Sequence, residues 1–298
     1  MPRAGAAKRL RRDGAAILGL LVLVTALGAA LLAPVLSPGD PVKNDLLGRL
    51  SPPMWLDGGD RAHPLGTDTL GRDVLSRLLH GARVSLWIGL TAVMMAAILG
   101  VPIGLWTGYR GGWPDDLFMR LGEIQLAFPV LLLGIALLAV LGASLVNLIL
   151  VLGVSGWITY ARIVRGETLS LKERGFVEAA RALGAADRYL IFRHILPNVW
   201  APIVVVATFS IARVIIAEAS LSFLGLGLPP PAPSWGAMLD EGRNYLTTGW
   251  WLALFPARHL ARRSRHQPRR GLATRSARPA SRARNLGARH GTWFASYP

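Results

Sequence analysis

Glu178-Ala-Ala-Arg-Ala-Leu-Gly184 and its continuation as far as His194-Ile-Leu-Pro197 lie between two long apolar runs. The first half favours a short helix, and Gly184 is expected to end it. A turn-rich segment is expected from Asp187 onward. Apolar residues recur every three to four positions on one face of the predicted helix: Phe176, Ala180 and Leu183. An amphipathic helix between two hydrophobic segments indicates a structured connection rather than a solvated loop.

The spacing of this stretch resembles the EAA loop of the membrane permease subunits of binding-protein-dependent ABC importers. Glu178-Ala179-Ala180, Gly184 and Leu196-Pro197 fall on that pattern in register. His194 replaces the usual isoleucine, as in the dipeptide and oligopeptide branch. In that family the helix docks into a cleft on a separate ATPase subunit. The resemblance therefore implies these ATPase-coupling residues: Phe176, Glu178, Ala179, Ala180, Leu183, Gly184, His194, Leu196 and Pro197. The alternative is an ordinary cytosolic connector helix with an Ala-rich face.

The composition is that of a membrane protein. The 298 residues are 52% hydrophobic, and the chain contains no cysteine, which excludes disulfides and thiolate metal sites. We expect neither a metal nor a cofactor. The net charge of +16 is concentrated in residues 257–298, which hold eleven arginines and no acidic residue. The charge of the remaining chain is therefore modest.

Long uncharged runs predict an all-α, polytopic membrane protein with five transmembrane helices and an incomplete sixth. Residues 14–39, 84–109 and 197–217 each have the length of one crossing, although Arg213 interrupts the last. The uncharged run 124–161 is too long for one crossing of a core about 30 Å thick. It is expected to fold back at Gly142-Ala-Ser144, which gives spans three and four.

Basic residues before the first run are expected to hold the N-terminus in the cytoplasm, and residues 110–120 form an expected inner connector. The predicted divisions are residues 1–36 for the N-terminus and first helix, 37–83 for an extracytoplasmic loop, and 84–256 for the permease core. The core contains the coupling loop 176–197, whose basic surplus also favours the cytoplasm. A cleaved signal peptide is the alternative for the first run.

Two further stretches resemble the peptide-permease branch. The first is His63-Pro-Leu-Gly-Thr-Asp-Thr-Leu-Gly-Arg-Asp-Val-Leu-Ser-Arg77, and the second runs from Leu228 to Gly242 and implies an outer loop with a short surface helix. Asp68, Arg72 and Asp73 suggest either a metal or catalytic cluster or a hydrogen-bonded cap on the next helix, and the cap is the favoured interpretation. Tryptophans are expected at the membrane interface: Trp235, Trp250 and Trp251.

Arg213 and Glu218 are charged residues at the end of the fifth predicted span. A charged side chain inside the bilayer costs free energy, so its presence suggests a functional site. The two residues are interpreted either as part of the translocation path or as a structural pair, with each other or with a neighbouring helix.

Residues 250–256 begin an apolar run, but the chain then becomes Arg-rich to its end. A bilayer core does not accept so many arginines. We expect residues 257–298 to be an aberrant, disordered tail produced by a shifted reading frame near codon 256. The alternative is a basic tail that binds anionic lipid or nucleic acid, but no nucleic-acid motif is present and no such partner is expected.

The resemblance implies a type I ABC importer permease in the inner membrane of a prokaryote, carrying di- or oligopeptides. Its implied partners are a second homologous permease, two ATPases and an extracytoplasmic binding protein. ATP is expected on the ATPases, because no Gly-Lys-Ser/Thr phosphate loop is present. The chain is not expected to be an enzyme. A nickel or other small-solute importer of the same branch and an ion-driven secondary transporter are the alternatives, with a membrane-embedded enzyme a third.

Overall fold

The computed structural model describes residues 27–264, and every element in this range is a helix. The expectation of an all-α fold is confirmed for this part of the chain. In order, the elements are α3 (Ala33–Leu36), the 3₁₀-helix η1 (Leu46–Gly48), α4 (Val74–Arg110), α5 (Trp113–Leu126), α6 (Val130–Leu141), α7 (Leu145–Lys172), α8 (Gly175–Ala182), α9 (Asp187–Tyr189), the π-helix η2 (Leu190–Ile195), α10 (Leu196–Phe223), α11 (Trp235–Arg243) and α12 (Trp251–Ser264).

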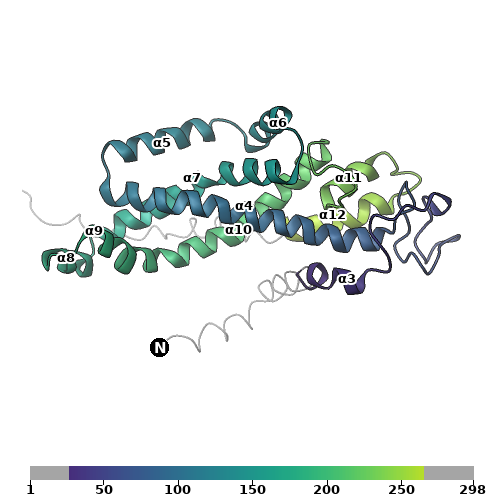
Figure 1. Cartoon of the computed structure of the whole chain (residues 1–298), viewed down its shortest axis with the longest axis horizontal. Helices are drawn as coiled ribbons and strands as arrows, with labels where there is room; N and C mark the ends of the chain where they lie inside the picture. The colour runs from purple at the N-terminus through teal and green to yellow at the C-terminus, as the bar shows by residue number, and fades with distance from the viewer. Residues whose placement is uncertain (1–26, 265–298) are drawn as a thin grey trace, which may run out of the picture. The chain divides into compact units, whose positions relative to one another are not determined.

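The long helices α4, α7 and α10 lie side by side, with α8 and α9 at one end and α11 and α12 at the other (Figure 1). The contact between α4 and α7 depends on glycines spaced four residues apart. A β-carbon at Gly100 or Gly104 would come within 2.3 or 2.5 Å of the backbone oxygens of Trp157 and Ala161. Only glycine permits this approach, which is the way helices associate where lipid removes the hydrophobic driving force.

Three helical segments are long and apolar enough to cross a membrane, namely Val74–Arg110, Leu145–Lys172 and Asp187–Phe223. A fourth crossing is obtained if α5 and α6, which are bent by 87°, count as one broken span. The structure therefore contains three or four of the five predicted spans in its described part. The first predicted span, residues 14–39, lies largely outside the described residues.

The third span differs from its predicted form. Helix α5 begins at Trp113, so most of the predicted connector 110–120 is helical, and the break falls before Val130, at Pro129. Proline lacks the N–H that would continue the helix, which explains the break there. The predicted turn at Gly142-Ala-Ser144 is confirmed: Gly142 has φ of +83°, and Ser144 caps α7 by accepting from Asn147 N–H.

The segment from Asp187 was predicted to be rich in turns, and this is wrong. It is helical throughout and continuous with α10, through the π-helix η2. Pro197 has no N–H to donate and crowds the carbonyl one turn before it. A wider turn ahead of a proline relieves such crowding, and the Asn198 side chain also donates to the His194 carbonyl at 2.6 Å.

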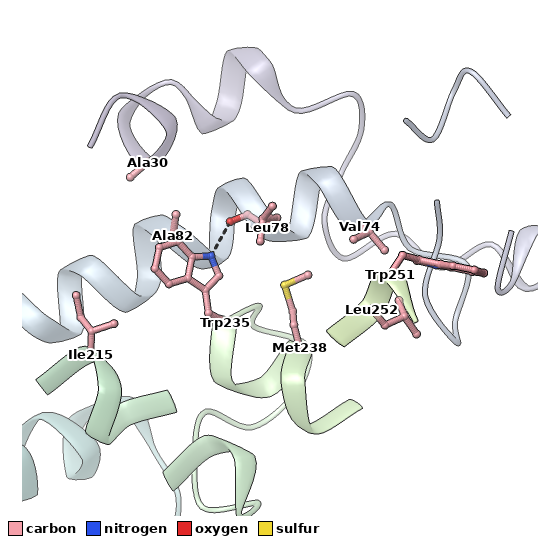
Figure 2. Packing of buried hydrophobic residues seen from close by; sticks show 9 residues of the cluster. All are labelled: Ala30, Val74, Leu78, Ala82, Ile215, Trp235, Met238, Trp251 and Leu252. Carbon is pink, nitrogen blue, oxygen red and sulfur yellow. Dashed lines mark hydrogen bonds between the residues drawn. The ribbon is translucent and has the colours of Figure 1, made fainter. Parts of the chain in front are cut away.

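A buried cluster joins α11 and α12 to the beginning of α4 (Figure 2). Trp235 Nε1 donates to the Leu78 carbonyl at 3.1 Å, and Trp251 Nε1 donates to the Thr67 carbonyl at 3.1 Å. Both indoles are almost fully buried, 1% and 4% exposed. Their large apolar rings therefore pack this end of the molecule together, and their position at the membrane interface stays a prediction.

Helix α12 continues to Ser264, so residues 257–264 are helical and not disordered as predicted. With 14 residues it is shorter than the roughly 20 that a bilayer crossing needs. The rest of the predicted tail lies outside the described residues.

Candidate functional site

Helix α8 presents most of its surface to solvent. Val177 is fully buried and anchors the helix, and sequence reasoning missed it. Phe176 is 44% and Leu183 is 89% exposed. Glu178 and Ala179 are also exposed, and Ala180 is half-buried. Glu178 lies in the first turn, where a carboxylate interacts favourably with the helix dipole. Val177 is thus the one buried residue of α8, while Glu178 and Leu183 remain available for contact.

Gly184 ends α8 with a left-handed backbone, φ +84°. Its N–H donates to the Arg181 carbonyl at 2.9 Å, and the Ala185 N–H donates to the Ala180 carbonyl at 3.1 Å. These two bonds form a Schellman motif, in which glycine is preferred because other residues are strained at positive φ. The predicted helix end is confirmed.

A polar contact ties the coupling loop to α4. The Tyr109 hydroxyl donates to Asp187 Oδ1 at 2.6 Å, and the Arg181 guanidinium lies 5.7 Å from the centre of the Tyr109 ring. Tyr109 is the next-to-last residue of α4, so α4 contacts both sides of the turn at Gly184. The local sequence pattern could not predict these contacts, because the residues are far apart in the chain.

His194 lies in η2, and its ring faces Tyr189 and Phe176 with centroids 5.5 and 6.2 Å apart. It therefore connects α8 to the helix that enters the membrane. Leu196 and Pro197 begin α10, Leu196 half-buried and Pro197 exposed. The nine residues implied by the resemblance thus lie on α8, the turn after it, and the continuous helix that follows.

Arg213 and Glu218 do not form an ion pair among the described residues. Glu218 is fully buried and accepts from Ser222 Oγ at 2.8 Å and from Ser85 Oγ of α4 at 3.2 Å. Arg213 is exposed and donates to Ser210 Oγ at 3.1 Å. Their direct pairing is therefore wrong, because the two side chains leave α10 toward different neighbours.

A cavity of about 320 Å³ lies between α4, α6, α7 and α10, and Arg213 lines it. The other lining residues are mainly apolar, with several hydroxyls among them.

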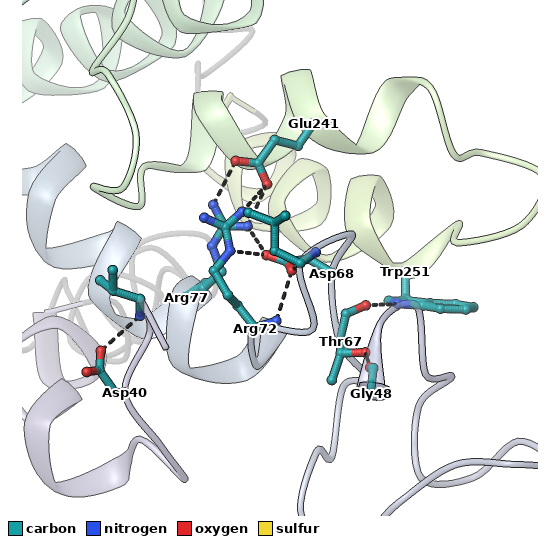
Figure 3. Close-up of polar contacts among 10 residues, drawn as sticks. Asp40, Gly48, Thr67, Asp68, Arg72, Arg77, Glu241 and Trp251 are labelled. Atoms are coloured by element: carbon teal, nitrogen blue, oxygen red, sulfur yellow. Dashed lines mark hydrogen bonds and ion pairs between the residues drawn. The ribbon is translucent and has the colours of Figure 1, made fainter. Parts of the chain in front are cut away.

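At the other end of α4, a buried network replaces the suggested metal cluster (Figure 3). Asp68 Oδ2 accepts from Arg72 Nε at 2.6 Å and from Arg77 Nη1. Glu241 of α11 accepts from both arginines, at 3.0 Å from Arg72 and at 2.6 and 2.9 Å from Arg77. Asp73 caps α4 as expected, accepting from Ser76 N–H at 2.6 Å. Sequence reasoning missed Glu241, which is remote in the chain.

Much of the helical core and the exposed loop at its end lie in a stretch of sequence that matches a known protein family. Residues 100–257 match the family described as binding-protein-dependent transport system inner membrane component. The chain is 42% identical over 238 residues, 80% of its length, to the di/tripeptide transport system permease protein DppC of Pseudomonas aeruginosa, covering 78% of that protein.

The chain belongs to this family.

As a binding-protein-dependent inner membrane component, it also matches the N-terminal TM domain of oligopeptide transport permease C over residues 2–53. It is 41% identical over 248 residues to the glutathione transport system permease protein GsiD of Pectobacterium atrosepticum, covering 83% of this chain and 80% of that one. A solved MetNI methionine ABC transporter aligns with a TM-score of 0.49 and 19% identity, over 63% of this chain and 91% of that one. The family is one of transport components and not of enzymes.

Proposed function

We propose that this inner membrane component is a permease subunit of an ATP-driven importer of di- or oligopeptides, and that α8 transmits the ATPase motion to the membrane helices. The exposed α8, anchored by the buried Val177 and joined to the helix Asp187–Phe223, is the observation that carries the proposal. Peptide cargo is favoured over nickel because the permeases compared above are named for di/tripeptides and for glutathione.

The proposed assembly contains a second, homologous permease, two ATPases and an extracytoplasmic binding protein. Closure of the nucleotide-bound ATPases would draw the two docked α8 helices together. Helix α8 is linked to η2, and so to α10, by the contact of Phe176 with His194, and to α4 by Arg181, which lies over the Tyr109 ring. A displacement of α8 is therefore passed to two membrane helices at once, and the substrate path opens alternately to either side.

The proposed topology is multi-pass, with a cytoplasmic N-terminus and five complete spans. It requires α8 in the cytoplasm and the predicted loop 37–83 outside, although its residues 74–83 form the start of α4. Helices α8 and α11 lie at opposite ends of α4 (Figure 1), and Glu241 of α11 belongs to the Asp68 network, which supports this arrangement. An ion-driven secondary transporter would instead need acidic or histidine relays within the spans.

A pair of single-cysteine variants tests sidedness and docking, since the chain has no cysteine of its own. Leu47 and Leu183 are 100% and 89% exposed. In intact cells, a membrane-impermeant maleimide should label Leu47→Cys and leave Leu183→Cys unlabelled until the membrane is opened. A thiol cross-linker should then join Leu183→Cys, and not Leu47→Cys, to an ATPase subunit. Labelling of Leu183→Cys from outside would exclude the proposal.

We further propose that the chain after about residue 257 is translated in a shifted frame. The family match ends at residue 257, and the Arg-rich composition begins at the same place. Re-reading the gene beyond codon 256 in the other two frames should yield about 20 apolar residues that complete a sixth span. If neither frame yields them, the basic tail is genuine and the frameshift is rejected.

A further inference from the structure

We infer that Arg213 binds the carboxylate of the transported peptide inside the cavity between α4, α6, α7 and α10. This inference rests on the proposed function and assigns a specificity-determining residue to its path. Arg213 lies within a candidate membrane span, about 15 Å along α10 from the helix end at Phe223, and a bilayer core is about 30 Å thick. An arginine there is costly unless an anion or water compensates it.

The described residues of this chain provide no such anion. Arg213 makes no ion pair among them, and its one hydrogen bond, to Ser210 Oγ, uses a single donor of the five that a guanidinium carries. Glu218, the nearest acidic residue in sequence, is occupied by Ser222 and Ser85. The remaining donors of Arg213 are therefore free to bind a ligand.

Hydroxyl donors accompany Arg213 at the cavity wall. The Tyr160 hydroxyl is buried, makes no hydrogen bond of good geometry, and lies near Ser210 and Arg213. Ser210 Oγ accepts from Arg213 and lies close to the Tyr160 hydroxyl, so the two hydroxyls together supply a further donor at this wall. A guanidinium with two hydroxyls offers donors to both oxygens of a carboxylate, which is the anion that such a set recognises best.

The rest of the wall suits the body of a small peptide and not a single side chain. Gly156 and Ala217 add little side-chain bulk to the wall, and Val93 and Leu152 provide an apolar surface. A volume of about 320 Å³ is at the lower end of small-molecule sites. The carboxyl-terminal part of a di- or tripeptide matches both the size and the charge. A carboxylate from the partner permease is the competing source of the anion.

The test measures peptide binding to the full chain, co-expressed with its partner subunits and placed in lipid nanodiscs. The probe is a radiolabelled dipeptide with a free carboxylate, compared with the same dipeptide amidated at its C-terminus. Arg213→Gln should weaken binding of the free acid about 10- to 100-fold and leave the amide unchanged. Arg213→Lys should retain part of the preference for the free acid over the amide. Lysine keeps the positive charge but lacks the planar guanidinium that binds both carboxylate oxygens.

Arg83→Gln is the matched control, since Arg83 is an exposed arginine of α4 outside the cavity. It should preserve the preference for the free acid. If Arg213→Gln weakens the binding of both peptides equally, the inference is overturned and the arginine has a structural role. If it weakens the binding of neither peptide, the inference is also overturned. Stimulation of ATP hydrolysis by the binding protein is recorded separately. If the binding protein does not stimulate ATP hydrolysis in the unaltered complex, the proposed function is rejected. The measured preference for the free acid is independent of that result.

Discussion

Replacement of Asp68 by asparagine is expected to lower the free energy of unfolding by about 3–5 kcal/mol. Asp68, Arg72 and Arg77 are each 4% exposed or less, and one carboxylate oxygen of Asp68 contacts both guanidiniums. Asparagine keeps the shape but loses the charge. Glu241, whose side chain is 28% exposed, would remain the one acid facing two buried arginines. An uncompensated buried charge is the most expensive outcome of a single substitution here.

Thermal unfolding in detergent, followed by circular dichroism, measures this effect. Asp57→Asn is the control, because Asp57 is an exposed acid in the same loop and the same atoms change. That variant should unfold within about 0.5 kcal/mol of the unaltered chain. If Asp68→Asn unfolds like the control, Asp68 does not neutralise the two arginines, and the network does not hold the loop to α11.

Replacement of Gly184 by leucine is expected to reduce ATPase docking at least about tenfold while the membrane core stays folded. The φ of +84° costs a branched or bulky residue about 1–2 kcal/mol, so the chain would leave the Schellman geometry and redirect the end of α8. No atom lies within 4 Å of the position where the β-carbon would be, so the effect comes from the backbone and not from a clash. Co-purification of the ATPase subunits measures docking.

Two companion variants separate this cause from others. Gly184→Asn should restore most of the docking, since asparagine tolerates the left-handed region. Gly166→Leu places the same side chain at an exposed helical position of α7 with open space around it and should leave docking near normal. Unchanged docking in Gly184→Leu would show that the helix end does not position α8 on the ATPase.

Local sequence pattern predicted those features whose causes are local. The end of α8 at Gly184, the cap at Asp73 and the turn at Gly142 each depend on the conformational preference of a residue and its near neighbours. Their prediction needed no knowledge of the tertiary structure.

Features that depend on distant partners were not accessible in this way. Glu241 meets Arg77 across 164 residues of chain, and Tyr109 meets Asp187 across 78. The burial of the two indoles was not predicted, because hydropathy does not distinguish a ring in lipid from a ring in a protein core. The helical segment after Asp187 was missed because its polar residues obscure a helix that tertiary contacts stabilise.

The uninterrupted helix Asp187–Phe223 has a mechanical consequence. With 37 residues it is about 55 Å long, and its wide turn at Leu190–Ile195 maintains the backbone hydrogen bonding without a hinge. We expect this helix to move as one piece, so that a displacement near Asp187 is transmitted along its whole length to Glu218. Under the proposed function, force generated on one face of the membrane would reach the other without any change in the length or fold of this helix.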